Sequence, residues 1–300
     1  MTWIGLSAVS AILLGFYDVT KKMAVRKNAV PIVLLISVSV GCVLWLPFIA
    51  WSAISPETVP HRLLRVDSLS MGKHVLLIAK SILVGASWTL AFFSLKRLPL
   101  SIAAPIRSTS PVWTIAIAAL FLRERPSVSQ WIGIVIVLIA FWSFSAVGLR
   151  EGVSFRRDRG VAMMIVATIL GALSSIYDKF LLQSVGITPS TVQAWFSVYL
   201  VPVMIPMAVS WSRNHRERTP FQWRWINLAI CPLLLVADIF YFTALADPEA
   251  LVSIVSVVRR CSVVISFSFG IRALGEANFW PKAACILGIL VGVAVLALGG

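Results

Sequence analysis

The amino-acid sequence predicts an all-α integral membrane protein with ten transmembrane helices, arranged as two inverted five-helix repeats around a central cavity. Three observations lead to this fold class. The 300 residues are 59% hydrophobic and only 13% charged, whereas roughly 25% of the residues in a soluble domain are charged. Apolar runs of about 20 residues, the length that crosses a bilayer, recur along the chain. The second part of the chain also repeats the residue pattern of the first part.

Short segments rich in proline and charge separate the apolar runs, for example Lys-Arg-Leu-Pro at Lys96–Pro99 and Asp-Pro-Glu at Asp247–Glu249. Proline cannot continue a helix, and charged residues favour the aqueous side of a membrane. We therefore expect ten helices between these breaks, over Trp3–Val25, Val30–Ser52, Lys73–Leu95, Leu100–Leu122, Val128–Gly148, Gly160–Ser184, Pro189–Trp211, Trp223–Ala246, Glu249–Ala273 and Phe279–Leu298.

A Tyr-Asp pair ends the first expected helix and recurs late in the sixth, where Asp178 follows Asp18 by 178 − 18 = 160 positions. A longer match joins PIRSTSPVWTIAIAALFLRE (105–124) to VVRRCSVVISFSFGIRALGE (257–276). There Arg259 follows Arg107 by 259 − 107 = 152 positions, and the terminal glutamates keep the same offset.

These matches predict two homologous domains, residues 1–150 with helices 1–5 and residues 151–300 with helices 6–10. Because each repeat crosses the membrane an odd number of times, its two copies must lie in opposite orientations. Inverted repeats around a site at the bilayer midplane are typical of secondary transporters, in which alternating access moves one repeat against the other.

Each repeat ends its fourth helix in an acidic turn, LFLRERPSVSQWIG at Leu120–Gly133 and RALGEANFWPKAACILG at Arg272–Gly288. In this arrangement the chain resembles the drug/metabolite transporter superfamily, in particular its EamA-type ten-helix carriers. The resemblance implies a central cavity lined by the first, third, fourth, sixth, eighth and ninth helices, and export or exchange of small metabolites. The pair Arg259-Arg260 is similar to the basic pair on the ninth helix of the superfamily's sugar-phosphate translocators.

Two adjacent arginines lie near the middle of the ninth expected helix. An arginine at mid-bilayer costs roughly 2.5–3.5 kcal/mol on insertion scales, so it faces a hydrated cavity or a partner. A guanidinium presents a fixed fork of donors that suits carboxylate or phosphate groups. We therefore assign substrate binding to these arginines and to aromatic and basic residues on neighbouring helices: Arg259, Arg260, Arg107, Tyr17, Tyr177 and Trp88.

Further charged residues within the apolar runs are candidates for ion coupling or charge pairing: Asp18, Asp178, Asp238, Lys22 and Lys179. One interpretation is internal neutralisation, in which Asp18 pairs with Arg107 and Asp178 pairs with Arg259. Arg260 is left over, because Ser108 occupies its position in the first repeat. The lysines, including Lys21 and Lys80, have an equally simple alternative in which their ammonium groups reach water along the helix.

The surplus of bases over acids favours a secondary transporter that moves a small anionic or zwitterionic organic metabolite, by exchange or with protons. One alternative is an exporter of cationic or aromatic drugs or of amino acids, in which the aspartates bind the substrate. Another is a membrane enzyme that acts on lipid headgroups, but no set of catalytic residues supports it. We expect no enzymatic activity, cofactor or metal. We expect a small-molecule substrate, a lipid bilayer and no nucleic acid as partners, with a homodimer left open.

The net charge of +14 lies largely in the loops, which is typical of a multi-pass protein of the cell (inner) membrane. With cytoplasmic termini, as in EamA carriers, most loop arginines and lysines would be outside, among them Arg156, Arg157, Arg213 and Arg224. Because positive charge resists translocation, loop charge instead favours both termini outside.

Overall fold

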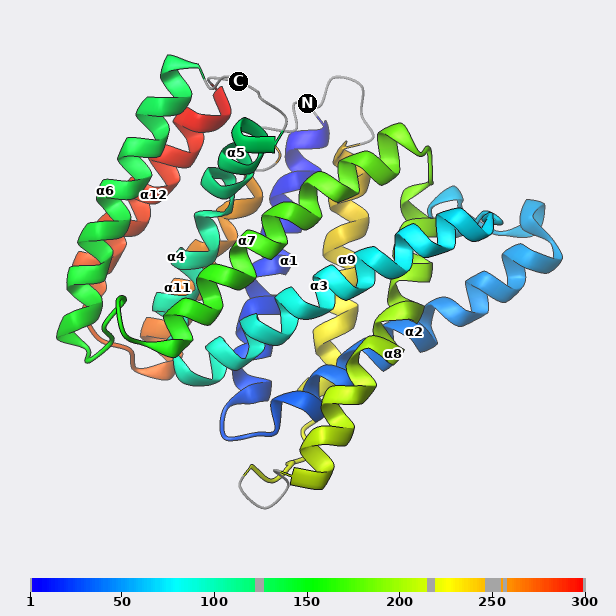
Figure 1. Cartoon of the computed structure of the whole chain (residues 1–300), viewed down its shortest axis with the longest axis horizontal. Helices are drawn as coiled ribbons and strands as arrows, with labels where there is room; N and C mark the ends of the chain where they lie inside the picture. Colours follow the sequence, from blue (N-terminus) through cyan, green and yellow to red (C-terminus); the bar gives the residue numbers. More distant parts are fainter. Residues whose placement is uncertain (1, 122–126, 215–218, 246–254, 256–257, 299–300) are drawn as a thin grey trace.

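The computed structural model describes residues 2–121, 127–214, 219–245, 255 and 258–298. This part of the chain folds into α-helices joined by short turns (Figure 1). The helices, in chain order, are α1 (Thr2–Val25), α2 (Val30–Ile54), α3 (Met71–Arg97), α4 (Leu100–Ser108), α5 (Ser110–Phe121), α6 (Val128–Arg150), α7 (Arg159–Lys179), α8 (Pro189–Asn214), α9 (Ile226–Leu245), α11 (Ser262–Leu274) and α12 (Phe279–Leu298).

Many of the described helices have the length and hydropathy that a membrane crossing requires. Six segments of the described chain meet both conditions: Trp3–Val25, Val30–Ile54, Met71–Arg97, Val128–Arg150, Arg159–Leu182 and Pro189–Arg213. The apolar parts of α9 and α12, Ile226–Tyr241 and Phe279–Val295, are shorter. The all-helical membrane fold predicted from the sequence is therefore confirmed.

The fourth expected helix is not continuous, and the prediction of one helix over Leu100–Leu122 is wrong. Thr109 interrupts it and separates α4 from α5. At the interruption the hydrogen bonds span three residues, from the Thr109 N–H to the Ile106 carbonyl (3.2 Å) and from the Val112 N–H to the Thr109 carbonyl (3.0 Å). Pro111 explains the break, because proline has no N–H to donate to the carbonyl four residues earlier.

The ninth expected helix, Glu249–Ala273, is interrupted in the same way. Its first part lies largely outside the described residues, residues 258–260 are helical, and α11 starts after Cys261. The Cys261 N–H donates to the Val258 carbonyl (3.1 Å), and the Val264 N–H donates to the Cys261 carbonyl (3.0 Å). The sixth expected helix also departs from the prediction, because α7 ends in a π-helical turn over Phe180–Ser184. The interruptions at 109 and 261 lie within two residues of Arg107 and of the pair Arg259-Arg260, respectively.

Helices distant in sequence pack side by side: α1 with α9, α3 with α7, α2 with α8, and α6 with α12 (Figure 1). The first residues of α1 and the last described residues of α12 lie at the same end of the bundle. Gly292 permits the close approach of α12 to α6, since a Cβ there would lie 2.9 Å from the Val137 backbone nitrogen. Small residues at such contacts are typical of helix packing in membranes.

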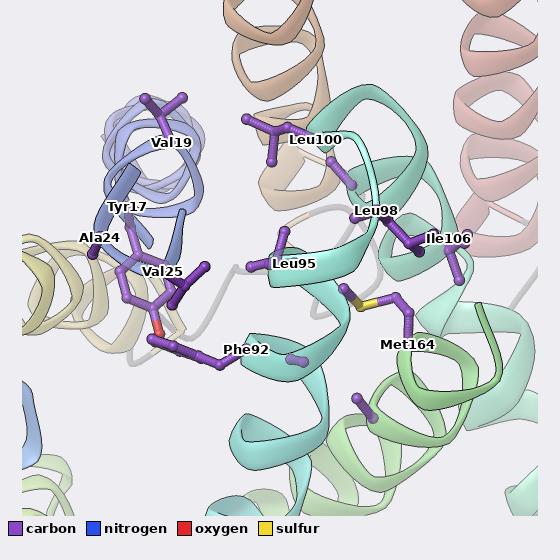
Figure 2. Packing of buried hydrophobic residues seen from close by; sticks show 14 of the residues in the cluster. Tyr17, Val19, Ala24, Val25, Phe92, Leu95, Leu98, Leu100, Ile106 and Met164 are labelled. Carbon is purple, nitrogen blue, oxygen red and sulfur yellow. The ribbon is translucent and has the colours of Figure 1, made fainter. Parts of the chain in front are cut away.

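The largest cluster of buried side chains draws residues from most of the described helices, and Figure 2 shows the part of it where α1, α3, α4 and α7 meet. Tyr17 of α1 and Phe92 of α3 are each 1% exposed, and Figure 2 shows the Tyr17 ring directed toward Phe92. Leu98, Ile106 and Met164 extend the cluster toward α4 and α7. This apolar packing fixes the positions of the helices that carry Asp18, Lys80, Arg107 and Asp178.

Candidate functional site

A cavity of about 200 Å³ lies between helices from both parts of the chain. Its described walls come from α1, α3, α4, α7, α8 and α9, from the first residue of α5, from Arg259 and Arg260, and from the first two residues of α11. The six expected helices that the family resemblance implied (first, third, fourth, sixth, eighth and ninth) all contribute to these walls. The seventh expected helix, α8, contributes as well. Residues 1–150 and 151–300 therefore both contribute to one site.

Charged side chains are concentrated on this otherwise apolar and hydroxyl-bearing wall. A buried charge is costly unless it is paired, so their partners decide what the cavity can bind. The described lining residues include three acids and four bases, namely Asp18, Asp178, Asp238, Lys80, Arg107, Arg259 and Arg260.

Asp18 bonds two cations through one carboxylate oxygen. Its Oδ1 lies 2.9 Å from Arg107 Nη1 and 2.5 Å from Lys21 Nζ. The Arg107 side chain is 34% exposed, but that of Lys21 is 1% exposed, and Lys21 is not among the described lining residues. The predicted Asp18–Arg107 pair is confirmed. Lys21 does not reach water along its helix as the simpler alternative supposed, because its ammonium lies 4.0 Å from the centre of the Tyr17 ring.

The second predicted pair, Asp178 with Arg259, is wrong. Asp238 of α9 forms the ion pair with Arg259, and the Arg259 guanidinium carbon lies 3.8 Å from the centre of the Tyr241 ring. Asp178 instead pairs with Lys80 of α3. The reason is helix packing: α7 lies along α3, so the nearest base to Asp178 is on the other part of the chain.

Arg260 differs from the other three bases that line the cavity. Each of the three acids is paired with Arg107, Arg259 or Lys80. Among the described residues, no carboxylate forms an ion pair with Arg260. Its Nε atom, like that of Arg259, is buried without a hydrogen-bond partner. The cavity therefore carries a guanidinium whose charge these acids do not balance.

The aromatic candidates separate into one lining residue and two packing residues. Trp88 lines the cavity and meets Phe196 edge to face, with ring centres 5.9 Å apart. Tyr17 and Tyr177 are not among the described lining residues. Tyr17 is buried in the core, and the Tyr177 hydroxyl donates to the Leu76 carbonyl at 3.1 Å.

Lys22 and Lys179 were also candidates. The Lys22 ammonium donates to the carbonyl oxygens of Leu95 (2.7 Å) and Leu98 at the end of α3, outside the described lining. Lys22 therefore caps the C-terminal end of α3, where carbonyl groups without a partner in the helix favour a cation. The side chain of Lys179 lies outside the described part of the structure, as does Glu124, the first acidic turn residue.

Sequence reasoning did not assign Lys80 and Lys21 to the site. Lys80 is the tenth residue of the 27-residue helix α3, which places it well inside the apolar span. Lys21 follows Asp18 by three residues, a spacing that puts two side chains on one helix face. Both signals are present in the sequence, although each is also compatible with a lysine that reaches water.

At the end of the bundle where α3 is joined to α4, polar groups of residues 151–300 bond the backbone of residues 1–150. The Glu276 carboxylate accepts hydrogen bonds from the N–H groups of Leu100 (2.7 Å) and Ser101 (2.8 Å). Lys282, fully buried, donates to Ser101 Oγ and to Glu151. The two parts are thus fastened to each other on this side of the cavity.

Residues 1–146 match the EamA-like transporter family. Over 212 residues the chain is 26% identical to "Pseudopaline exporter CntI" of Pseudomonas aeruginosa strain UCBPP-PA14, covering 69% of this chain and 68% of that protein. An 82-residue stretch, 27% of this chain and 28% of the other protein, is 29% identical to an uncharacterized transporter of Archaeoglobus fulgidus. A crystal structure with 16% identity shares the fold at a TM-score of 0.61, over 98% of this chain and 97% of that one. The resemblance drawn from the sequence is confirmed, and the protein is a multi-pass membrane protein.

Proposed function

We propose that this protein, whose residues 1–146 belong to the EamA-like transporter family, is a secondary transporter that moves a small anionic or zwitterionic organic metabolite across the membrane. The transport is driven by exchange or by proton coupling and follows alternating access. Similarity to the pseudopaline exporter CntI of two Pseudomonas aeruginosa strains supports export as the direction of transport.

The observation that carries the substrate class is the charge of the cavity wall. Its described residues hold four bases and three acids, and all three acids are paired with bases other than Arg260. The Nε atoms of Arg260 and Arg259 are both buried without a hydrogen-bond partner. A charged donor that is buried without a partner destabilises the folded protein, so an anion that binds to Arg260 stabilises it. A guanidinium binds a carboxylate or phosphate through two parallel hydrogen bonds, which gives the anion a defined orientation.

The mechanism rests on ten helices in two inverted repeats. The interruptions at Thr109 and Cys261 support it, because 261 − 109 = 152 is also the spacing of Arg107 and Arg259. Their flanking hydrogen bonds correspond residue by residue at this offset. The packing supports it as well, since the pair α1–α9 becomes the pair α7–α3 when the repeats are exchanged. In such a design a site between the repeats is exposed to each side of the membrane in turn.

The aromatic part of the wall favours a second candidate. Trp88, Phe196 and Tyr241 line the cavity, and aromatic faces attract cationic and aromatic molecules. An exporter of cationic or aromatic drugs or of amino acids would use these rings together with the aspartates. We place it second because Asp18, Asp178 and Asp238 are already bonded to basic side chains.

Thermal unfolding of the purified protein with sugar phosphates, organic acids, amino acids and cationic dyes tests the proposal, because a ligand of the folded state raises the melting temperature. We expect anions or zwitterions to raise it, and we expect Arg260→Gln to weaken their binding about tenfold. Arg97→Gln, which changes an exposed arginine at the end of α3, is the control. A response confined to cationic dyes, or unchanged anion binding in Arg260→Gln and Arg259→Gln alike, contradicts the proposal.

A further inference from the structure

Lys21 is a buried cation directly behind the cavity wall. It lies three residues after Asp18 on α1, its side chain is 1% exposed, and its ammonium is 2.5 Å from Asp18 Oδ1. The rings of Tyr17 and Phe92, with centres 4.0 and 5.7 Å from the ammonium, enclose it on the side of the core. Asp18 thus separates Lys21 from the cavity.

The same Asp18 oxygen also accepts a hydrogen bond from Arg107. One negative charge is therefore shared by two positive charges, and the group of three carries a net charge of +1 when all are ionised. Exposure decides where this surplus is presented, because the Arg107 side chain is 34% exposed and those of Lys21 and Asp18 are 1% and 12% exposed. The surplus charge faces the cavity through Arg107.

Arg260 supplies a second surplus charge on the same wall, whereas Arg259 with Asp238 and Lys80 with Asp178 are balanced pairs. Charges inside a low-dielectric cavity interact more strongly than in water, so the wall favours a ligand that neutralises both. A ligand with one negative charge balances only one of the two.

We propose that Lys21 is a positioning residue which neutralises Asp18 from behind and thereby leaves Arg107 free for a second negative charge of the substrate, beside the charge bound by Arg260. This inference rests on the proposed function and narrows its substrate class to small organic anions with two negative charges. Two carboxylates or one phosphate monoester both meet this requirement. Lys21 itself does not touch the substrate.

The test compares probes that differ by one charge: succinate with succinamate, and glycerol phosphate with its methyl ester. Binding to the full-length protein in detergent is measured from ligand-dependent melting temperatures. We expect the wild type to bind at least one of the two dianions more tightly than its monoanionic partner. In Lys21→Met, Asp18 neutralises Arg107, so affinity for that dianion falls about tenfold, while affinity for its partner changes less than about threefold.

Removing the acid together with the lysine restores the charge of the site. We therefore expect Asp18→Asn/Lys21→Met to regain the dianion affinity of the wild type to within about threefold. A lysine that only packs would leave the double variant as weak as Lys21→Met. Lys282→Met is the matched control, because it removes a fully buried lysine that is paired with Glu151, outside the described cavity lining. We expect it to keep the wild-type ratio of dianion affinity to monoanion affinity.

The outcomes separate this inference from the proposed function. If Lys21→Met retains dianion binding, if the double variant stays weak, or if neither dianion binds more tightly than its partner, the role of Lys21 is overturned. If Arg260→Gln and Arg259→Gln both leave the binding of every anion unchanged, the proposed function fails, whatever Lys21→Met does.

Discussion

The carboxylate of Glu276 caps α4 from the opposite part of the chain, accepting the Leu100 N–H at 2.7 Å and the Ser101 N–H at 2.8 Å. These groups belong to the first turn of α4, whose N–H groups have no partner within the helix. Two glycines allow the carboxylate to lie there. Gly275 has a φ of 68°, which ends α11 and turns the chain back. Gly270 leaves room for the carboxylate, because a Cβ at this position would lie 2.7 Å from Glu276 Oε2.

Glu276→Gln is expected to destabilise the protein by about 1–2 kcal/mol, because an amide presents one acceptor oxygen to two donors and no charge to the helix N-terminus. Thermal unfolding in detergent measures the change. Glu57→Gln, at an exposed position in the turn Pro56–Thr58, is the control and should unfold at the wild-type temperature. An unchanged melting temperature in Glu276→Gln would show that this cap contributes nothing to stability.

Gly292→Ala is expected to destabilise the packing of α12 on α6 by about 1–3 kcal/mol, because the added methyl group meets backbone atoms that cannot move away. Its Cβ would lie 2.9 Å from the Val137 nitrogen and 3.0 Å from the Gly133 oxygen. Gly5→Ala is the matched control, since a Cβ there has no described neighbour within 4 Å. Equal melting temperatures for the two variants would contradict the close contact.

Asp238→Asn is expected to cost about 2–3 kcal/mol of stability, because it leaves Arg259 without its carboxylate in a partly buried position. The double variant Asp238→Asn/Arg259→Met removes the unpaired charge and should recover most of this loss. Unfolding free energies of the two single variants and the double variant complete the cycle. A double variant that is less stable than Asp238→Asn argues against the pair as the main interaction of Arg259.

Loop charge predicts that both termini lie outside the cell. The start of α1 and the end of α12 lie at the same end of the bundle, so a reporter at the C-terminus gives the membrane side of both ends (Figure 1). Fusions at the C-terminus with alkaline phosphatase, active outside, and with a fluorescent protein that matures inside are expected to give phosphatase activity alone. Fluorescence without phosphatase activity would reverse the orientation.

The sequence by itself determined the all-helical membrane fold, most helix positions and six of the seven charged residues in the described cavity lining, all but Lys80. Hydropathy is a local property, because every backbone polar group in a bilayer must be satisfied within its own segment, so apolar runs translate directly into helices. The Arg107–Asp18 pair was also predictable, since Arg107 is the only base on the first repeat's fourth expected helix between Leu100 and Leu122.

Only the tertiary structure decided the partners of the remaining charges. Asp178 has Lys80 as its partner and Arg259 has Asp238, because the packing of α7 along α3 and the position of α9 beside residues 258–260 set these distances. The burial of Lys21 between Asp18, Tyr17 and Phe92 was likewise decided by helix packing. Hydropathy and residue spacing along a segment specify that the segment forms a helix. They do not specify which side chains of other helices lie beside it, because these neighbours depend on how the helices are rotated and packed against one another.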